Sequence, residues 1–562
     1  MRRALAQLPV IITLVASLAV ADPPARTDEL AKAQSFVTFK HSGYFRLRSD
    51  LFYRADLGND LFHRGDLLGN GSFHPSLGGS DDSVLGSANM RFRWQPELAI
   101  GQAIRVGTVI DVLDNAVLGS SPDWAPDRAD APLAFLSETQ ASPSSASDGL
   151  KKSLRVKQLW GEWDIAHSLL LRVGRMADHW GLGVVHNGGE CLDCDFGDTT
   201  DRASILIQAI DLQSLWFFDY PGEGTTSARR VDPFGQAIDE TQMDDVYRWG
   251  FTLGQTPLGR VALEKRTRDL ASRKVVVDWG LRNTFTSQAL SSDVPTARPK
   301  PDDGKPDPDC SILDPLARPY DCKNLQKRDA SFWLPDAWLK LQWRQSLELA
   351  FRAELELAAV YGSVGFTQNV VEPSSDRDFL GFGGVLQLEL QHRKLTYSLE
   401  TGFATGDDVV FGPYGPDLTV PDAEYPQDVN ERLRADKNVT RFLFNRDYHV
   451  DLLLYREVIG AVTNSVYVKP TVRAHLIAND AMVIGAEASV LYAHAIDTAS
   501  TPGHEAPLGI EEDVRLFYEE PNALRIDIEA GLLEPLGALR NGQGGRDPKI
   551  AFTLQARLTA QF

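Results

Sequence analysis

Carboxylates and cysteines are concentrated in one stretch of the chain, residues 171–202, which reads LRVGRMADHWGLGVVHNGGECLDCDFGDTTDR. Four of its carboxylates recur at short spacing: Asp193, Asp195, Asp198 and Asp201. Hard carboxylate oxygens at such spacing can hold calcium, but an EF-hand loop would carry a bidentate glutamate where this chain has Ser204. We therefore favour a solvated acidic loop that faces outside, and keep calcium at these four residues as the weaker alternative.

The chain has four cysteines, and they fall into two local pairs: Cys191, Cys194, Cys310 and Cys322. In an exported chain an even count points to disulfides, and the local connectivity (191–194 and 310–322) is favoured because each pair lies within one expected loop. The other two connectivities stay open. A zinc site is disfavoured because eleven residues, rather than two, separate the cysteines of the second pair.

Groups that could support catalysis also occur in this stretch, where Asp178, His179 and His186 share one expected loop. Further histidines are scattered along the chain, at His41, His63, His74 and His449. The sequence contains no G-x-S-x-G, H-E-x-x-H or Walker pattern. We therefore assign no catalytic residue and no cofactor, and predict that the protein is not an enzyme.

The first residues predict export. Arginines at positions 2 and 3 precede an apolar run over residues 8–20 and the small-residue site Ala19-Val20-Ala21, which is the pattern of a cleaved signal peptide. The alternative is a buried N-terminal helix. After residue 21 there is no run of eighteen apolar residues that would form a transmembrane helix. The predicted organisation is a signal peptide (1–21), a short N-terminal segment (22–35) and one domain (36–562).

That domain must position its functional residues with strands, because apolar and polar residues alternate through it. The alternation is strictest at the end, where every second residue from Phe552 to Phe562 is apolar. Period two over such lengths predicts strands with one apolar and one polar face. We expect about eighteen strands (between about 16 and 20): 36–48, 87–99, 103–113, 153–165, 168–176, 203–211, 214–220, 245–254, 273–287, 331–343, 346–361, 379–391, 394–404, 463–477, 481–495, 511–518, 523–533 and 549–562.

Such strands cross lipid only as a closed barrel, so we predict an all-β, transmembrane, antiparallel β-barrel. A soluble exported β-rich protein is the alternative. Short turns alternate with long polar loops: 49–86, 114–152, 288–330 and 405–462. The short turns are expected on the periplasmic side and the long loops outside. Two segments depart from this rhythm: 255–272, expected as a longer periplasmic turn with a helical piece, and 441–456, expected in a loop or folded into the lumen.

The terminal LTAQF, with Phe562 as the last residue, resembles the C-terminal aromatic signal of bacterial outer-membrane β-barrel proteins. The resemblance implies insertion by the barrel-insertion machinery and an outer-membrane location, with outer-membrane lipid around the barrel. GRMADHWGLG, at 174–183, resembles more weakly a glycine-arginine-tryptophan signature of polysaccharide-exporting and carbohydrate-associated barrels. Tryptophans in or near the ends of expected strands suit interfacial girdles: Trp94, Trp160, Trp163, Trp249, Trp279, Trp333, Trp338 and Trp343.

The polar faces of the expected strands carry charges of opposite sign on opposite walls. The basic wall contains Lys40, Arg46, Arg48, Arg91, Arg93 and Arg557. The acidic wall contains Glu348, Glu354, Glu356, Glu389 and Glu400, with Arg352 among them. This predicts a transverse field across a water-filled lumen, similar to that of general diffusion porins. The alternative is that the charges pair across adjacent strands and fill the lumen; Asp527 and Glu529 lie near the basic wall and weaken the segregation.

One position conflicts with the expected alternation. Arg172 and Gly174 share one face of their strand, whereas Arg175 falls with Val173 on the lipid face. A bulge, or a strand that ends near residue 175, would resolve the conflict.

Together these features predict a porin-like channel for small polar or charged solutes. A formal net charge of -20 argues against nucleic acid as a partner. Rival interpretations are a plugged barrel that anchors, assembles or exports envelope polymer, and a barrel enzyme acting on lipid or surface polymer. A homo-oligomer is possible for any of them.

Overall fold

The computed structural model describes residues 37–58, 84–118, 154–165, 168–209, 212–224, 227–228, 238–239, 241–255, 260–292, 325–346, 348–365, 376–408, 438–540 and 547–562. The predicted signal peptide and the segment to residue 35 lie outside the described residues. So do Cys310, Cys322, His63 and His74.

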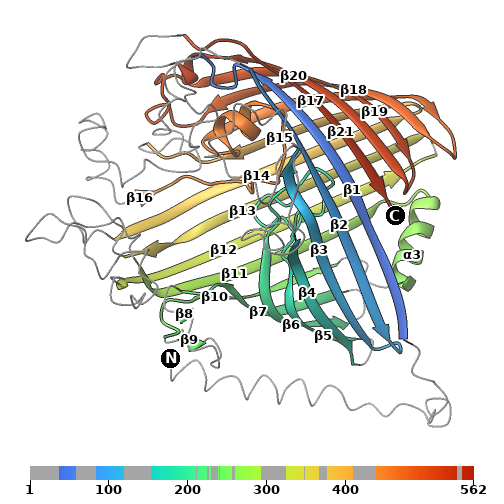
Figure 1. Cartoon of the computed structure of the whole chain (residues 1–562), viewed down its shortest axis with the longest axis vertical. Coiled ribbons are helices and arrows are strands. Elements are labelled where there is room, and N and C mark those ends of the chain that lie inside the picture. The colour runs from blue at the N-terminus through green and yellow to red at the C-terminus, as the bar shows by residue number, and fades with distance from the viewer. Residues whose placement is uncertain are drawn as a thin grey trace, which may run out of the picture.

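The strands form one closed antiparallel barrel (Figure 1). Eighteen strands make its wall: β1 (Val37–Tyr53), β2 (Val84–Ile100), β3 (Ile104–Val117), β4 (Leu154–Asp164), β5 (Leu169–Ala177), β6 (Thr199–Ala209), β7 (Leu212–Gly222), β10 (Val246–Gln255), β11 (Val276–Ser292), β12 (Leu325–Arg344), β13 (Leu349–Val364), β14 (Arg377–His392), β15 (Leu395–Ala404), β17 (Ser465–Ala478), β18 (Val483–Ala495), β19 (Pro507–Glu520), β20 (Leu524–Pro535) and β21 (Ala551–Gln561). Each pairs with the next, and β1 pairs with β21 to close the ring, with Tyr44 opposite Gln561.

This confirms the predicted barrel and its strand number. Each of the eighteen expected segments overlaps one strand of the wall. The wall strands alternate as predicted: along β21, Thr553 and Arg557 are buried toward the lumen, whereas Leu554 is exposed on the outer face. Three short strands are additional: β8 (Ser227–Ala228), β9 (Ile238–Asp239) and β16 (Asn438–Val439).

The turn between β10 and β11 contains helix α3 (Arg260–Ala271), which confirms the predicted helical piece. The guanidinium of Arg266 hydrogen-bonds Asp278 on β11 and Gln342 on β12, so the helix is tied to the lumen-facing side of these strands. Within the described ranges, no helix is long and apolar enough to cross a membrane.

Segment 441–456 lies inside the barrel, one of the two placements expected for it. It belongs to a longer stretch, 440–464, which we call the inner segment (Figure 1). Most of its apolar side chains are buried: Phe442, Phe444, Val450, Leu453, Leu454, Tyr455, Val458, Ile459 and Val462. The segment includes a π-helical turn, Leu454–Ile459. The carboxylate of Glu511 on β19 accepts the backbone N–H groups of Leu452, Leu453 and Leu454 at 2.9, 2.8 and 2.7 Å, respectively.

The bulge considered near Arg175 is absent. β5 pairs with β4 and β6 in continuous register through this residue, Leu159↔Arg175 and Arg175↔Asp201. Arg175 does lie on the outer face, where its guanidinium donates two hydrogen bonds to Asp201 at 2.8 and 2.7 Å. An ion pair between neighbouring strands therefore accommodates the charge, two residues before β5 ends at Ala177.

We expect Glu511→Ala to loosen the inner segment, because three buried N–H groups lose their acceptor. The predicted loss in the free energy of unfolding is about 3 kcal/mol or more. Thermal unfolding in detergent and limited proteolysis between residues 440 and 464 measure it. Glu512→Ala is the matched control, since Glu512 is the next residue of β19 and is exposed on the outer face. Equal melting temperatures for the two variants would contradict the anchoring role.

Candidate functional site

The functional surface of a barrel is its lumen, and two chain segments fold into this one. The first is residues 178–198, between β5 and β6, which we call the inner loop; the second is the inner segment. They contact each other, because the backbone N–H of Asn445 donates to the carbonyl of Val184 at 2.7 Å. The expectation that the acidic loop faces outside was therefore wrong for residues 193–198.

Arginines of the predicted basic wall hold the inner loop. Arg46 donates to the carbonyl of Leu192 at 3.0 Å, and Arg91 donates to that of Cys194 at 2.7 Å. Arg46 and Arg48 each approach Asp195 at 2.8 Å. Arg46 and Arg91 are completely buried, so protein atoms rather than water compensate their charges: atoms of the inner loop and, for Arg91, also the carboxylate of Asp114 on β3 at 2.7 Å. These inward arginines explain why an acidic loop turns into the barrel.

Asp193 joins three parts of the molecule. Its carboxylate lies 2.5 Å from Arg557 on β21, 2.6 Å from Arg456 in the inner segment, and 3.4 Å from Arg48 on β1. Burial by itself would raise the pKa of Asp193, but Arg456 and Arg557 outweigh burial and hold it well below its usual range. The side chain is therefore ionised at neutral pH, and it ties loop, segment and wall together.

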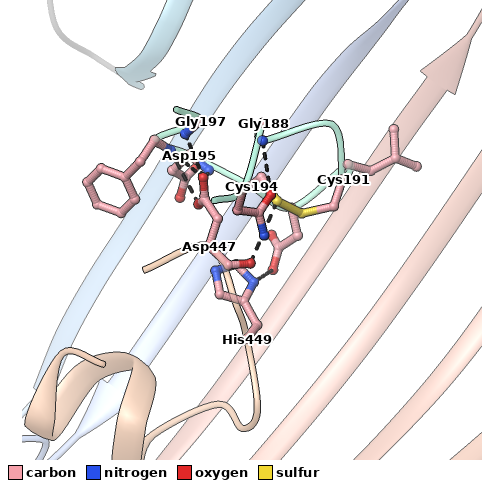
Figure 2. Close-up of a disulfide and its surroundings, with 12 residues drawn as sticks. Gly188, Cys191, Cys194, Asp195, Gly197, Asp447 and His449 are labelled. Atoms are coloured by element: carbon pink, nitrogen blue, oxygen red, sulfur yellow. Dashed lines mark hydrogen bonds and ion pairs between the residues drawn. A yellow bond between two sulfur atoms is a disulfide. The ribbon is translucent and has the colours of Figure 1, made fainter. Parts of the chain in front are cut away.

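A disulfide joins Cys191 and Cys194 at the tip of the inner loop (Figure 2), as the local pairing predicts. Asp447 of the inner segment caps the next turn of the loop. Its carboxylate accepts the backbone N–H groups of Asp195 at 3.0 Å and Gly197 at 2.6 Å. Backbone donors that enter the lumen thus find an acceptor on the other inward segment.

All four calcium candidates are engaged by protein groups. Asp193 and Asp195 meet arginines, while Asp201 pairs with Arg175 on the outer face. Asp198 accepts the N–H of Asn187 at 3.0 Å and the amide of Asn445 at 2.7 Å. Among the described residues no cluster of three or more metal-ligating side chains occurs.

The predicted acidic wall divides into two groups. Glu356 and Glu400 hold the inward segments: Glu356 accepts the N–H groups of Leu182 and Val184, and Glu400 accepts the hydroxyl of Tyr448 at 3.1 Å. The remaining members pair with neighbours on the wall or at a turn: Arg352 with Glu354 at 2.7 Å and with Glu389 at 3.7 Å, and Glu348 with Arg393 at 3.6 Å.

The basic wall is also balanced locally. Arg93 forms two hydrogen bonds with Asp111 on β3, at 2.7 and 2.8 Å, and Arg557 lies 3.3 Å from Glu529 on β20. These carboxylates, together with Asp193 and Asp195, reduce the charge separation on which the predicted transverse field depends. Lys40 differs from the other basic residues, since it is exposed and lines an open cavity.

Sequence reasoning missed a second arginine cluster. The carboxylate of Asp178 lies 2.9 Å from the guanidiniums of Arg202 and Arg282 and 3.3 Å from that of Arg248. His186 lies beside them, 3.3 Å from Asp178. Burial and the positive charge of Arg282 lower the pKa of His186 to about 3, so this histidine is neutral. The sequence could have indicated this cluster, because all three arginines occupy inward positions of strands whose apolar and polar residues alternate.

The end of the lumen nearest the short turns contains a cavity of about 1520 Å³. Side chains of β1–β7, β10 and β11 line it, with the inner loop at one side and Lys265 of α3 near the turn. His41 and His179 both reach it. Its wall mixes basic, acidic and uncharged polar groups, so the cavity suits water and polar solutes.

Comparison with known proteins gives structural neighbours only. OccAB3 of Acinetobacter baumannii is 10% identical, with a TM-score of 0.44 and coverage of 93% of this chain and 99% of that one. OccK11 (OpdR) of Pseudomonas aeruginosa is 10% identical, with a TM-score of 0.43 and coverage of 93% and 96%. The outer membrane protein OpdK of the same species is 10% identical, with a TM-score of 0.42 and coverage of 93% and 99%. No family model and no curated protein matches the sequence.

Asp195→Asn tests the attachment of the inner loop, because it leaves two buried guanidiniums short of a charged partner. We expect a loss of about 3 kcal/mol in the free energy of unfolding. Asp547→Asn is the control: it removes a carboxylate from an exposed pair with Arg540 outside the strands and is expected to cost less than about 1 kcal/mol. Denaturant titration of both variants measures the difference, and similar losses would contradict a buried attachment.

The same contact has a defined pH dependence. Burial favours a higher pKa for Asp195, but Arg48 and Arg46 outweigh it and lower the pKa from 3.8 to about 2. A lowered pKa stabilises the folded state above the ordinary value, and that contribution is lost as the pH falls through about 2. The stability gap between wild type and Asp195→Asn is therefore constant near neutral pH and narrows between about pH 4 and 2. If the stability difference between wild type and Asp195→Asn already decreased near neutral pH, the lowered pKa of Asp195 would be contradicted.

Proposed function

We propose that this protein is an outer-membrane channel for small polar or charged solutes. The observation that carries the proposal is a polar cavity of about 1520 Å³ inside a closed barrel. A barrel whose outer face is apolar and whose interior holds a chamber of this size has the composition expected of a transmembrane pore. The lumen-facing side chains are the surface that a passing solute meets.

The outer-membrane location rests on the faces of the strands and on the chain ends. Large apolar side chains are exposed on the outer face, among them Leu159, Trp216 and Leu516. In lipid these side chains are favourable, whereas in water they would form an extensive apolar surface. The predicted signal peptide and the terminal Phe562 support the same location. That the barrel-insertion machinery recognises Phe562 remains a prediction, and so does the formation of a homo-oligomer.

The two inward segments make this a constricted channel rather than a wide one. The inner loop and the inner segment fill part of the lumen on the side of the long loops, where arginines and carboxylates fix them in place. A solute therefore passes groups held at defined positions, which favours selection by charge and hydrogen bonding. The transverse field remains a prediction for solutes that reach this constriction.

A second candidate is a plugged barrel with a role in envelope assembly or polymer export. The buried apolar cluster around Leu453, Leu454 and Tyr455 favours it, because these side chains occupy lumen volume that a wide pore would leave to water. Catalysis is not proposed, and the absence of enzyme activity stays a prediction from sequence.

Single-channel recording in planar bilayers decides between these candidates. We expect stable current steps proportional to salt concentration, because ions reach the cavity through water. Glu511→Ala should increase the step size or add larger substates, since the inner segment is then less firmly held. A sealed bilayer, with insertion of the folded protein demonstrated by heat-modifiable migration and protease protection, would overturn the channel and favour the plugged barrel. Glu512→Ala is again the control and should match wild type.

A further inference from the structure

Two tryptophans, Trp160 and Trp180, line the cavity. Trp160 was expected in an interfacial girdle, and Trp180 had no expected role. Trp160 on β4 faces the lumen, opposite Gly107 on β3 and Gly174 on β5. The indole lies over Gly107 so closely that a Cβ there would come within 2.5 Å of the Trp160 ring. With no side chain beneath it, the ring lies flat against the barrel wall. The girdle expectation was therefore wrong for Trp160.

Trp180, at the start of the inner loop, is seated in the same way on another strand. Its ring covers Gly280 on β11, where a Cβ would come within 2.6 Å of the indole. The indole N–H donates to Asp336 at 3.1 Å, which fixes the orientation of the ring. Both indoles are partly exposed and both line the cavity.

The cavity around these rings contains uncharged hydrogen-bonding side chains among its charged groups. Amides and hydroxyls of three strands, β4, β6 and β10, face the same cavity: Gln158, Ser204, Gln208 and Thr252. Amides both donate and accept, and hydroxyls do the same. Flat apolar faces bordered by such groups match an amphipathic ring solute that carries many hydroxyls.

The arginines of the cavity are already engaged by carboxylates. Arg105 and Arg172 both bind Glu162, and the Arg172 guanidinium also lies 4.9 Å from the centre of the Trp160 ring. Arg202 and Arg282 both contact Asp178. Because a fixed carboxylate already occupies each pair, a solute carboxylate would have to compete with it. An uncharged solute does not compete with these carboxylates, and at Trp160 it has to share the ring only with the Arg172 guanidinium.

We propose that the cavity binds neutral oligosaccharides, with the faces of Trp160 and Trp180 as stacking platforms for pyranose rings. A pyranose presents an apolar C–H face to an indole while its equatorial hydroxyls reach the surrounding amides. This deepens the proposed function by naming a solute class for the same lumen, and it rests on that function only for transport, since binding can be measured without it.

The first experiment records current through the protein in planar bilayers while maltohexaose is added. We expect concentration-dependent interruptions of the current. Trp160→Ala and Trp180→Ala should each weaken the apparent affinity by about five- to tenfold, the loss expected for one aromatic contact. Trp160→Phe should retain most of it. Trp249→Ala is the control, because Trp249 is exposed on the outer face of β10 and should leave the block unchanged.

Gly107→Ala tests the geometry without removing an aromatic ring. The added Cβ displaces the Trp160 indole from the wall, so sugar affinity should fall although every tryptophan is present. A polyethylene glycol of matched size controls for volume. Equal block by this polymer, or block unchanged in both Trp→Ala variants, would overturn the proposal. Block by oligogalacturonate but not by maltohexaose would also overturn it, since the site would then select carboxylates.

Binding in detergent separates this proposal from the channel itself. Intrinsic tryptophan fluorescence and calorimetric titration with maltohexaose need no conduction. Saturable binding that Trp160→Ala weakens, together with a sealed bilayer, would overturn the channel and support the sugar site. Current steps without sugar binding would support the channel and overturn the sugar site. Circular dichroism and heat-modifiable migration test whether each variant is folded. If Trp160→Ala does not fold, Trp180→Ala and Gly107→Ala carry the test, because both are expected to weaken sugar binding.

Discussion

Backbone polar groups that enter the lumen of a barrel must find partners there, and the interior of this protein is built around that constraint. The wall strands satisfy their own N–H and C=O groups by pairing. The inner loop and inner segment have no such ladder, so carboxylates accept their N–H groups and arginines donate to their carbonyls. Glu511, Glu356 and Asp447 each accept two or more N–H groups of an inward segment. The inward fold of both segments depends on these contacts.

This constraint gives the charged walls a structural meaning. Arginines such as Arg46 and Arg91 are completely buried, and a buried guanidinium without acceptors would be strongly destabilising. The inner loop supplies acceptors through Leu192, Cys194 and Asp195, and Asp114 on β3 supplies one more to Arg91. The buried wall arginines and the inner loop therefore stabilise each other. The disulfide between Cys191 and Cys194 cross-links the loop tip that carries these acceptor atoms.

The strands could be predicted from sequence because alternation is a local signal: each of the eighteen wall strands shows it within its own residues. The inward folding could not, because it depends on pairs far apart in the chain. Arg46 meets Leu192 across 146 residues, and Asp447 meets Asp195 across 252. Charge identified the lumen-facing arginines, but it did not reveal that an acidic loop would bind them. Trp160 was misassigned although the local pattern marks its face, since Glu162, two residues further along β4, is buried toward the lumen and Leu159 is exposed on the outer face.

The lumen is consequently divided in function along its length. On the side of the long loops, charged side chains hold the inner loop and the inner segment in place. On the side of the short turns, the cavity keeps uncharged polar groups and two flat indoles exposed, while its arginines are engaged by Glu162 and Asp178. In the proposed channel, the inner loop and the inner segment restrict a solute that crosses both parts, and the cavity recognises it. Substitutions in the inner loop or the inner segment should therefore alter conductance more than sugar affinity, whereas substitutions of the two indoles should alter sugar affinity more than conductance. This separation of effects distinguishes a selective channel from a barrel whose lumen is only filled.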